Sequence, residues 1–169
     1  MKKQDLYVVA FCLVLFLPFF LSSSLYEFYK HFNAEHGMIT AAIKFGILST
    51  LGEIIGLRIR TGAYKLKGFG VLPRALVWAL LGMWINMSFK IFGAGAPRFA
   101  DYLGIEGVSA AMAGGFSGLK LLGAFLIAAS LNTSFGPVFM TLHKVTDTHI
   151  MANGGTLRGF FRPIPMASI

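Results

Sequence analysis

Long apolar runs separated by short polar segments dominate the pattern of this chain. Four runs are long enough to cross a membrane, at about residues 6–25, 38–57, 72–92 and 117–134. A helix of about 20 mainly apolar residues spans the hydrocarbon of a bilayer. The pattern therefore predicts an all-α fold, a polytopic membrane helical bundle with four transmembrane helices.

The pattern is least regular in the last third of the chain. The apolar stretch over residues 108–145 is too long for one span and too short for two regular ones. A kink or break is expected at Gly136–Pro137, followed by an interfacial or half-inserted helix over residues 138–151. We expect a single transmembrane domain over residues 1–151 and an irregular basic tail over residues 152–169.

The polar segments between the runs indicate an orientation. Residues 26–35 are close to charge balance and residues 93–107 are rich in Gly, so both are expected to be loops on the outer side. Four spans would place 10 of the 15 basic residues on the other side: Lys2, Lys3, Arg58, Arg60, Lys65, Lys67, Arg74, Lys144, Arg158 and Arg162. The positive-inside rule then predicts two cytoplasmic termini, in a bacterial inner membrane or an organelle membrane.

The alternative for the first run is a cleaved secretory signal peptide. A charged start at Lys2 and Lys3, an apolar stretch, Pro18 and the small residues Ser22–Ser24 also fit that description. The run is rather long for a signal peptide, which favours a retained first span.

The composition agrees with a membrane protein. Hydrophobic residues make up 56% of the chain, and the mean hydropathy is +0.69. The net charge of +8 comes from residues clustered between apolar runs, so no nucleic acid partner is expected. The basic segment with Arg58, Arg60, Lys65 and Lys67 is expected to meet anionic lipid head groups, and membrane lipids surround the helices.

Small residues form two stripes at helical spacing. The first is Ala42, Gly46, Ser49, Glu53 and Gly56, and the second is Ala75, Ala79, Gly82 and Asn86. Such stripes let membrane helices approach closely, and we expect helix packing at Gly46, Gly56, Gly82, Gly114 and Gly118. One stripe could be buried within the chain and the other offered to a homo-oligomer or another membrane protein.

Glu53 is the most informative polar residue, because a charge inside a span is costly and commonly marks a substrate or ion pathway. The candidate pathway or buried polar residues are Glu53, Lys44, Lys120, Asn86 and Asn132. The alternative for Glu53 is an interfacial carboxylate paired with Arg58 or Arg60. Lys44 is half a turn out of phase with Glu53, so these two are not expected to pair.

The chain offers little for catalysis or metal binding. His31, His36, His143 and His149 lack the spacing of a zinc helix, and no nucleotide or nucleophile motif occurs. We therefore expect no enzyme activity, metal or cofactor. A membrane enzyme that uses Glu53, His143 and the arginines on lipid head groups is a minor alternative.

Two passages resemble the Mpv-type family of peroxisomal and mitochondrial membrane proteins. The first is GILSTLGE over residues 46–53, followed by Arg58-Ile-Arg60, Pro73 and Trp78, and the second is Phe135-Gly136-Pro137 with His143 beyond it. The chain departs from the family pattern with Glu53 in place of Asp, Leu57 in place of Gln and Leu76 in place of His. The resemblance implies a four-span protein that forms a pore or channel, with Glu53, Arg58, Arg60 and Trp78 as the matching positions.

These patterns together predict a small integral membrane protein that forms or lines a pathway for a small solute or ion. The alternative is a non-catalytic accessory or assembly subunit of a larger membrane complex, whose small-residue stripes dock onto its partners.

Overall fold

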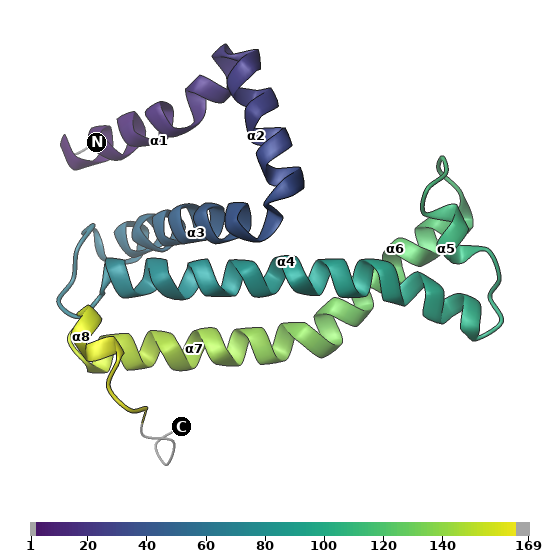
Figure 1. The fold of residues 1–169 in the computed structure, drawn as a ribbon. Helices are drawn as coiled ribbons and strands as arrows, with labels where there is room; N and C mark the ends of the chain where they lie inside the picture. Colours follow the sequence, from purple (N-terminus) through teal and green to yellow (C-terminus); the bar gives the residue numbers. More distant parts are fainter. Residues whose placement is uncertain (1–2, 165–169) are drawn as a thin grey trace.

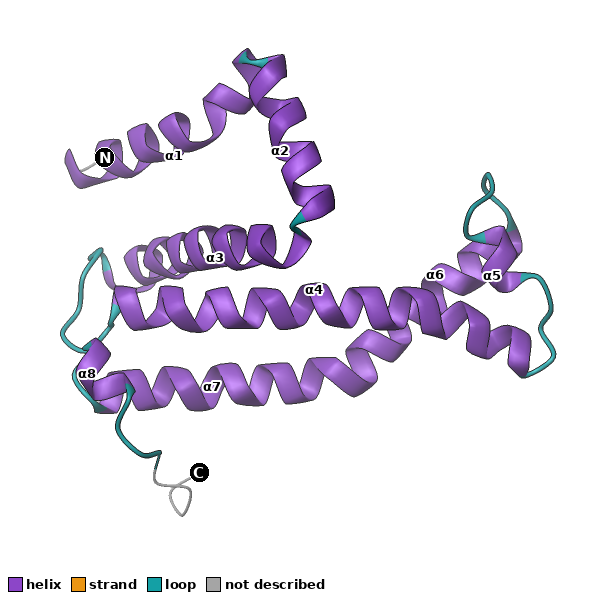
Figure 2. Cartoon of the chain, viewed as in Figure 1, coloured by secondary structure: helices purple, strands orange, loops and turns teal. Residues whose placement is uncertain are grey.

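The computed structural model describes residues 3–164, which are helical with short connections and contain no strand (Figure 2). Four helical stretches are long and apolar enough to cross a membrane: Lys3–Leu21, Gly37–Thr61, Val71–Tyr102 and Gly118–Ala152. The predicted all-α helical bundle is therefore confirmed. Lys2 and the end of the predicted tail lie outside the described residues.

Three helices lie side by side and form the body of the molecule: α3 (Gly37–Thr61), α4 (Val71–Tyr102) and α7 (Gly136–Ala152) (Figure 1). A small core of Val77, Leu81 and Ile150 joins α4 to α7, and Trp78, Trp84 and Phe139 pack against it. The loop over residues 62–70, the start of α4 and the end of α7 meet at one end, called here the loop end.

The two small-residue stripes face each other between α3 and α4. A Cβ atom on Gly46 would lie 3.2 Å from the Ala75 carbonyl oxygen and 3.4 Å from Ala79 Cβ. A Cβ atom on Gly82 would lie 2.7 Å from the Ala41 carbonyl oxygen. Both stripes are therefore used within the chain, which corrects the expectation that one of them is free for a partner.

The fourth long helix is continuous and does not break at Gly136–Pro137. It consists of α6 (Gly118–Ser130), a π-helical turn η1 (Leu131–Phe135) and α7. Pro137 has no N–H to donate to the preceding turn, and a π turn is one way in which a helix accommodates such a defect. Residues 138–151 thus continue the same helix and pack on α4. Their interfacial position stays a prediction.

Two segments predicted as loops are largely helical. α1 (Lys3–Leu21) ends at Leu21, and α2 (Ser23–Glu35) follows after Ser22, whose side chain accepts a hydrogen bond of 3.2 Å from the Leu25 N–H. α4 continues to Tyr102 and contains Pro97. Helix caps and tertiary contacts outweigh the charged and Gly-rich composition in these segments.

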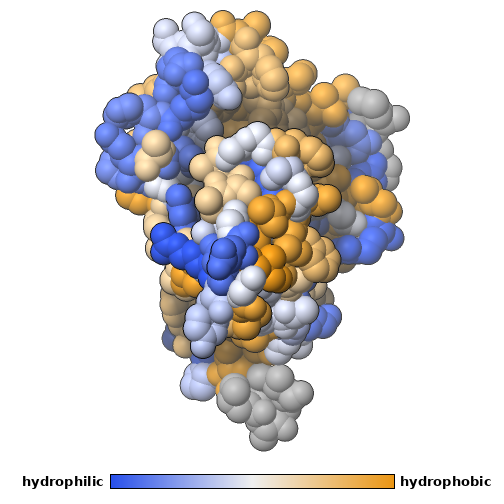
Figure 3. All heavy atoms as spheres, turned by 90° about the vertical axis from the view of Figure 1, so that its right-hand side faces the viewer, coloured by the Kyte–Doolittle hydropathy of each residue, from blue (hydrophilic) through white to orange (hydrophobic). Residues whose placement is uncertain are grey.

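Short elements occur in the tail and at the end of the molecule opposite the loop end, called here the far end. α5 (Val108–Ala111) is held by Asp101, which accepts hydrogen bonds from the Val108 N–H at 2.8 Å and the Ser109 N–H at 3.2 Å. Figure 3 looks onto this far end, where hydrophilic and hydrophobic residues are mixed. In the tail, α8 (Leu157–Phe160) forms one helical turn.

The glycines of the last long helix pack differently from the prediction. Gly114 precedes α6, and a Cβ atom on Gly118 would contact nothing within 4 Å. A Cβ atom on Gly123 would instead lie 2.6 Å from Met112 Sδ. Gly123 therefore provides the close approach between α6 and α5 that the sequence assigned to the Gly114–Gly118 pair.

Glycines allow the loop end to close tightly. Gly62 ends α3 with φ 73°, and its N–H bonds to the Arg58 carbonyl oxygen at 2.9 Å. Gly70 and Gly155 have φ values of 67° and 69°, and a Cβ atom on Gly155 would lie 2.7 Å from the Gly70 nitrogen. The loop before α4 and the turn after α7 therefore cross in backbone contact.

α1 and α2 form an arm that extends from the body (Figure 1). None of residues 3–21 is buried, and a space of about 560 Å³, lined mostly by apolar side chains, lies between α1 and the end of α3. Asp5 connects the start of the arm to the loop end, because its carboxylate accepts hydrogen bonds of 2.8 Å from both Arg58 Nε and the Tyr64 hydroxyl. Partial removal from water and the bond to Asp5 raise the pKa of Tyr64.

Candidate functional site

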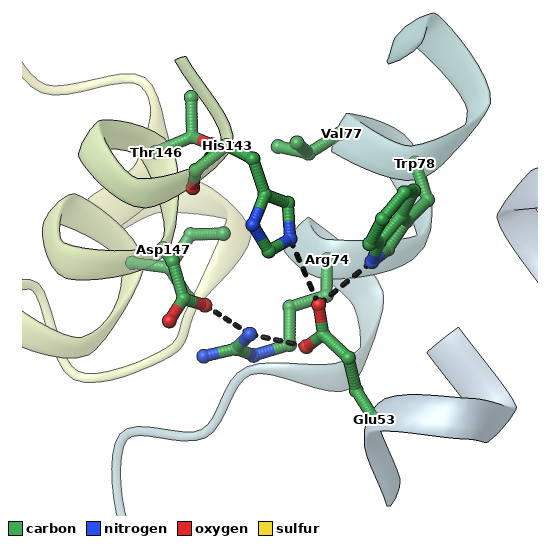
Figure 4. A pocket seen from close by; sticks show the side chains of 8 residues that line it. Glu53, Arg74, Val77, Trp78, His143, Thr146 and Asp147 are labelled. Atoms are coloured by element: carbon green, nitrogen blue, oxygen red, sulfur yellow. Dashed lines mark hydrogen bonds and ion pairs between the residues drawn. The ribbon is translucent and has the colours of Figure 1, made fainter. Parts of the chain in front are cut away.

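Glu53 lies at the centre of a polar cluster formed by α3, α4 and α7 (Figure 4). Its Oε1 accepts hydrogen bonds from Trp78 Nε1 at 2.7 Å and from His143 Nε2 at 3.0 Å. Its Oε2 forms an ion pair with Arg74 Nη1. Each of the other two helices thus contributes donors to the single carboxylate of α3.

Arg74 joins this carboxylate to a second one. Its Nη1 also forms an ion pair with Asp147 Oδ1, and its side chain is only 5% exposed. Its Nε donates a hydrogen bond of 2.5 Å to the Phe69 carbonyl oxygen, and its guanidinium lies 4.4 Å from the centre of the Phe69 ring. The loop before α4 therefore holds the arginine that bridges Glu53 and Asp147.

Helical spacing explains why these side chains converge. Arg74 and Trp78 are four residues apart on α4, and His143 and Asp147 are four residues apart on α7, so each pair lies on one helix face. Glu53 precedes the end of α3 by eight residues, which is about 12 Å at about 1.5 Å per residue. The cluster, called here the Glu53 cluster, thus lies inside the helices but nearer the loop end.

The Glu53 cluster is packed closely. The space among and just outside its lining residues is about 150 Å³, and it does not admit a water-sized sphere. The residues that line it are Glu53, Arg74, Val77, Trp78, His143, Thr146, Asp147 and Ile150. An open aqueous passage does not run through this part of the molecule in the conformation described.

The other predicted polar candidates do not join Glu53. Lys44 and Asn132 lie on the exposed surfaces of their helices, and the Asn132 side chain donates a hydrogen bond of 2.8 Å to the Ala128 carbonyl oxygen. Lys120 Nζ donates to the Gly114 carbonyl oxygen at 2.5 Å, at the far end of the molecule. Asn86 Nδ2 lies 3.2 Å from Met38 Sδ.

The predicted partners of Glu53 are also corrected. Arg58 binds Asp5, and Arg60 is exposed, as are Lys65 and Lys67. Gly56 does not serve close helix packing, because a Cβ atom there would meet only the Arg60 side chain, at 3.6 Å. The basic segment therefore does not neutralise Glu53.

Sequence reasoning missed two members of the cluster, Arg74 and Asp147. Both lie near the ends of apolar runs, where charged residues commonly face water and lipid head groups. The signal available in the sequence was the spacing of four residues between Arg74 and Trp78 and between His143 and Asp147. It shows which residues share a face, but not that the two faces meet.

Comparison with known protein families, with curated proteins and with solved structures finds no match. The resemblance to the Mpv-type family therefore stays a prediction from the motifs. Of the positions that carry it, Glu53 and Trp78 are in direct contact with each other, and His143 contacts both.

Proposed function

We propose that this protein forms or lines a pathway for a small solute or ion across a membrane, with the Glu53 cluster as its closed gate. The observation that supports the proposal is the convergence of ionisable side chains from three long apolar helices on one site that is largely shielded from water. Ionisable groups within membrane helices are costly and occur mainly where solutes, ions or protons pass.

The tight packing of the cluster corresponds to the closed state in this proposal. Opening requires Arg74 to release Glu53 or Asp147 and His143 to release Glu53, since both side chains join α3 to α7. The two carboxylates would then line the opened passage. The helix defect at η1 lies between the cluster and the far end, and π turns often occur at functional positions in helices.

We further propose that the loop end faces the cytoplasm. Asp5 binds Arg58, so the start of α1 lies at the same end as the end of α3 and the start of α4. If all four long helices cross, both ends of the described chain lie on one side. That side holds Lys3, the basic segment over residues 58–67 and Arg158, as the positive-inside rule requires of a cytoplasmic face.

Reconstitution tests the proposal. Vesicles that contain only the purified protein are loaded with a set of small ions and neutral solutes, and release is compared with that from empty vesicles. Glu53→Gln is expected to reduce release of cations, because it removes a carboxylate that lines the opened passage. Lys44→Gln, on the exposed face of the same helix, is the matched control and is expected to behave as the unmodified protein. Retention of every solute by vesicles with correctly folded protein would overturn the proposal.

A second function, as an accessory subunit of a larger membrane complex, is favoured by α1. This helix is apolar, none of its residues is buried, and the space beside it is lined by apolar side chains. Such a surface can receive a helix of another membrane protein. Extraction in a mild detergent followed by mass measurement distinguishes the two functions: a stoichiometric foreign protein supports the accessory role, and a homogeneous species of this chain alone contradicts it.

A further inference from the structure

The Glu53 cluster has an unequal number of positive and negative groups. Glu53 and Asp147 provide two carboxylates, whereas Arg74 provides one guanidinium. Among the described residues that line the cluster, His143 is the remaining ionisable one, and the others are Val77, Trp78, Thr146 and Ile150. With a neutral imidazole the cluster has a net charge of −1, and with a protonated imidazole it is neutral.

A net charge in a site largely shielded from water is unfavourable. Glu53, Asp147 and His143 are only 18%, 23% and 25% exposed, and Arg74 is 5% exposed. One further positive charge is therefore needed for the packed form. The geometry points to a proton, bound at His143, and we propose that the Glu53 cluster is a binding site for a single proton whose occupied form is the closed form.

The size of the site excludes a larger cation. The space within the cluster does not admit a water-sized sphere, and the Arg74 guanidinium already lies between the two carboxylates. Calcium requires six or more oxygen ligands, and magnesium keeps several waters of its own. A proton requires no space, so it is the cation that fits.

The contacts place this proton on the imidazole. An ionised carboxylate has acceptors only, so His143 Nε2 must be the donor in its 3.0 Å bond to Glu53 Oε1. Glu53 accepts a hydrogen bond from Trp78 and pairs with Arg74, and Asp147 also pairs with Arg74, so both carboxylates already face donors. The second proton of His143 therefore lies on Nδ1. The Trp78 ring contacts the imidazole, with its centre 4.6 Å from that of His143.

The consequence is a closed form that depends on pH. When His143 loses its proton, Glu53 and Asp147 are left with one guanidinium between them, and repulsion between the carboxylates is no longer balanced. The packed form is then stabilised at low pH and weakened as the pH rises through deprotonation of His143. The proton site rests on the geometry alone, whereas its role in controlling passage rests on the proposed function.

Nuclear magnetic resonance of the imidazole nitrogens tests the inference. The protein is labelled with ¹⁵N-histidine, placed in lipid nanodiscs and titrated from pH 8 to pH 5, and His143 is assigned from a variant in which the other three histidines are replaced by Gln. The expected result is a change from a neutral ring with hydrogen on Nε2 to a doubly protonated ring. A His143 ring that stays neutral down to pH 5 would overturn the proposal.

The variant Asp147→Asn shows whether the charge of the cluster controls this proton. It removes one negative charge, so the titration of His143 is expected to move to lower pH. His31, on the exposed face of α2 beside Glu35, is the internal control and should titrate identically in both proteins. An unchanged His143 titration in the folded variant contradicts the charge argument. A proton site without solute release would refute the proposed function only, and release without a proton site would refute this inference only.

Discussion

At the scale of single residues, Arg74 provides the one guanidinium between the two carboxylates of the site. It contacts both carboxylates of the Glu53 cluster and is 5% exposed. The lone acid in an apolar run made Glu53 predictable from the sequence. Its partners Arg74 and Asp147 were not predictable, because their contacts with Glu53 and with each other form only when α3, α4 and α7 pack together.

Replacing Arg74 by Met is expected to lower the free energy of unfolding by about 3 kcal/mol, since removal of one partner leaves buried charges unpaired. Unfolding in mixed micelles with increasing denaturing detergent measures the change. The control is Arg98→Met, at an exposed position of the same helix, which should change stability little. The triple variant Arg74→Met, Glu53→Gln, Asp147→Asn should recover part of the loss. Equal stability of Arg74→Met and the unmodified protein would show that the cluster is not buried as described.

Thr50 allows a test in which a substitution is expected to raise, rather than lower, the free energy of unfolding. Thr50 is 4% exposed, and its hydroxyl has no hydrogen-bond partner within residues 3–164. An unsatisfied buried hydroxyl costs about 1–3 kcal/mol, so Thr50→Val is expected to increase the free energy of unfolding by about 1 kcal/mol. The same detergent unfolding assay applies, and a loss of stability would indicate that the hydroxyl has a partner.

At the scale of helices, the contact between α3 and α4 positions the site. The small-residue stripes that produce it were visible in the sequence as helical spacing, but whether they face each other or a partner depends on the turn between the helices. The π turn at η1 was not predictable, because a proline signals a defect in a helix without specifying whether the helix breaks, kinks or continues.

Gly82→Ala tests this contact. The new Cβ would lie 2.7 Å from the Ala41 carbonyl oxygen, so α3 and α4 must separate, at an expected cost of about 1–3 kcal/mol. Gly93→Ala is the matched control on the same helix, because a Cβ atom there meets nothing within 4 Å. It should be neutral or slightly stabilising, since Ala favours helix over Gly. Identical effects of the two substitutions would contradict the packing of α3 on α4.

At the scale of the whole molecule, the body of α3, α4 and α7 and the arm of α1 and α2 are joined in different ways. The body has a shared core and the Glu53 cluster, whereas the arm is connected through the α2–α3 turn and the Asp5 contacts. Hydropathy predicted the four long helices, because length and composition suffice for that purpose. It could not predict the arm, because the position of an apolar helix in lipid depends on specific contacts at its ends.

The Asp5 contacts can be tested with a distance measurement. Cys12 is the single cysteine of the chain, and a spin label there can be paired with one at Leu80→Cys, an exposed position on α4. Asp5→Asn weakens the bond to Arg58 and is expected to broaden the distribution of distances between the labels, measured by pulsed electron spin resonance in nanodiscs. Lys30→Gln, in α2 away from these contacts, is the control. A distribution unaffected by Asp5→Asn would show that other contacts fix the arm.

The most direct test of the central claim is solute release from vesicles that contain only this protein, measured at pH 8 and pH 6. A gate closed by a proton on His143 predicts faster release at pH 8 than at pH 6, and His143→Gln should remove the difference. Retention of all solutes at both pH values, by protein shown to be folded in the vesicles, would contradict the account.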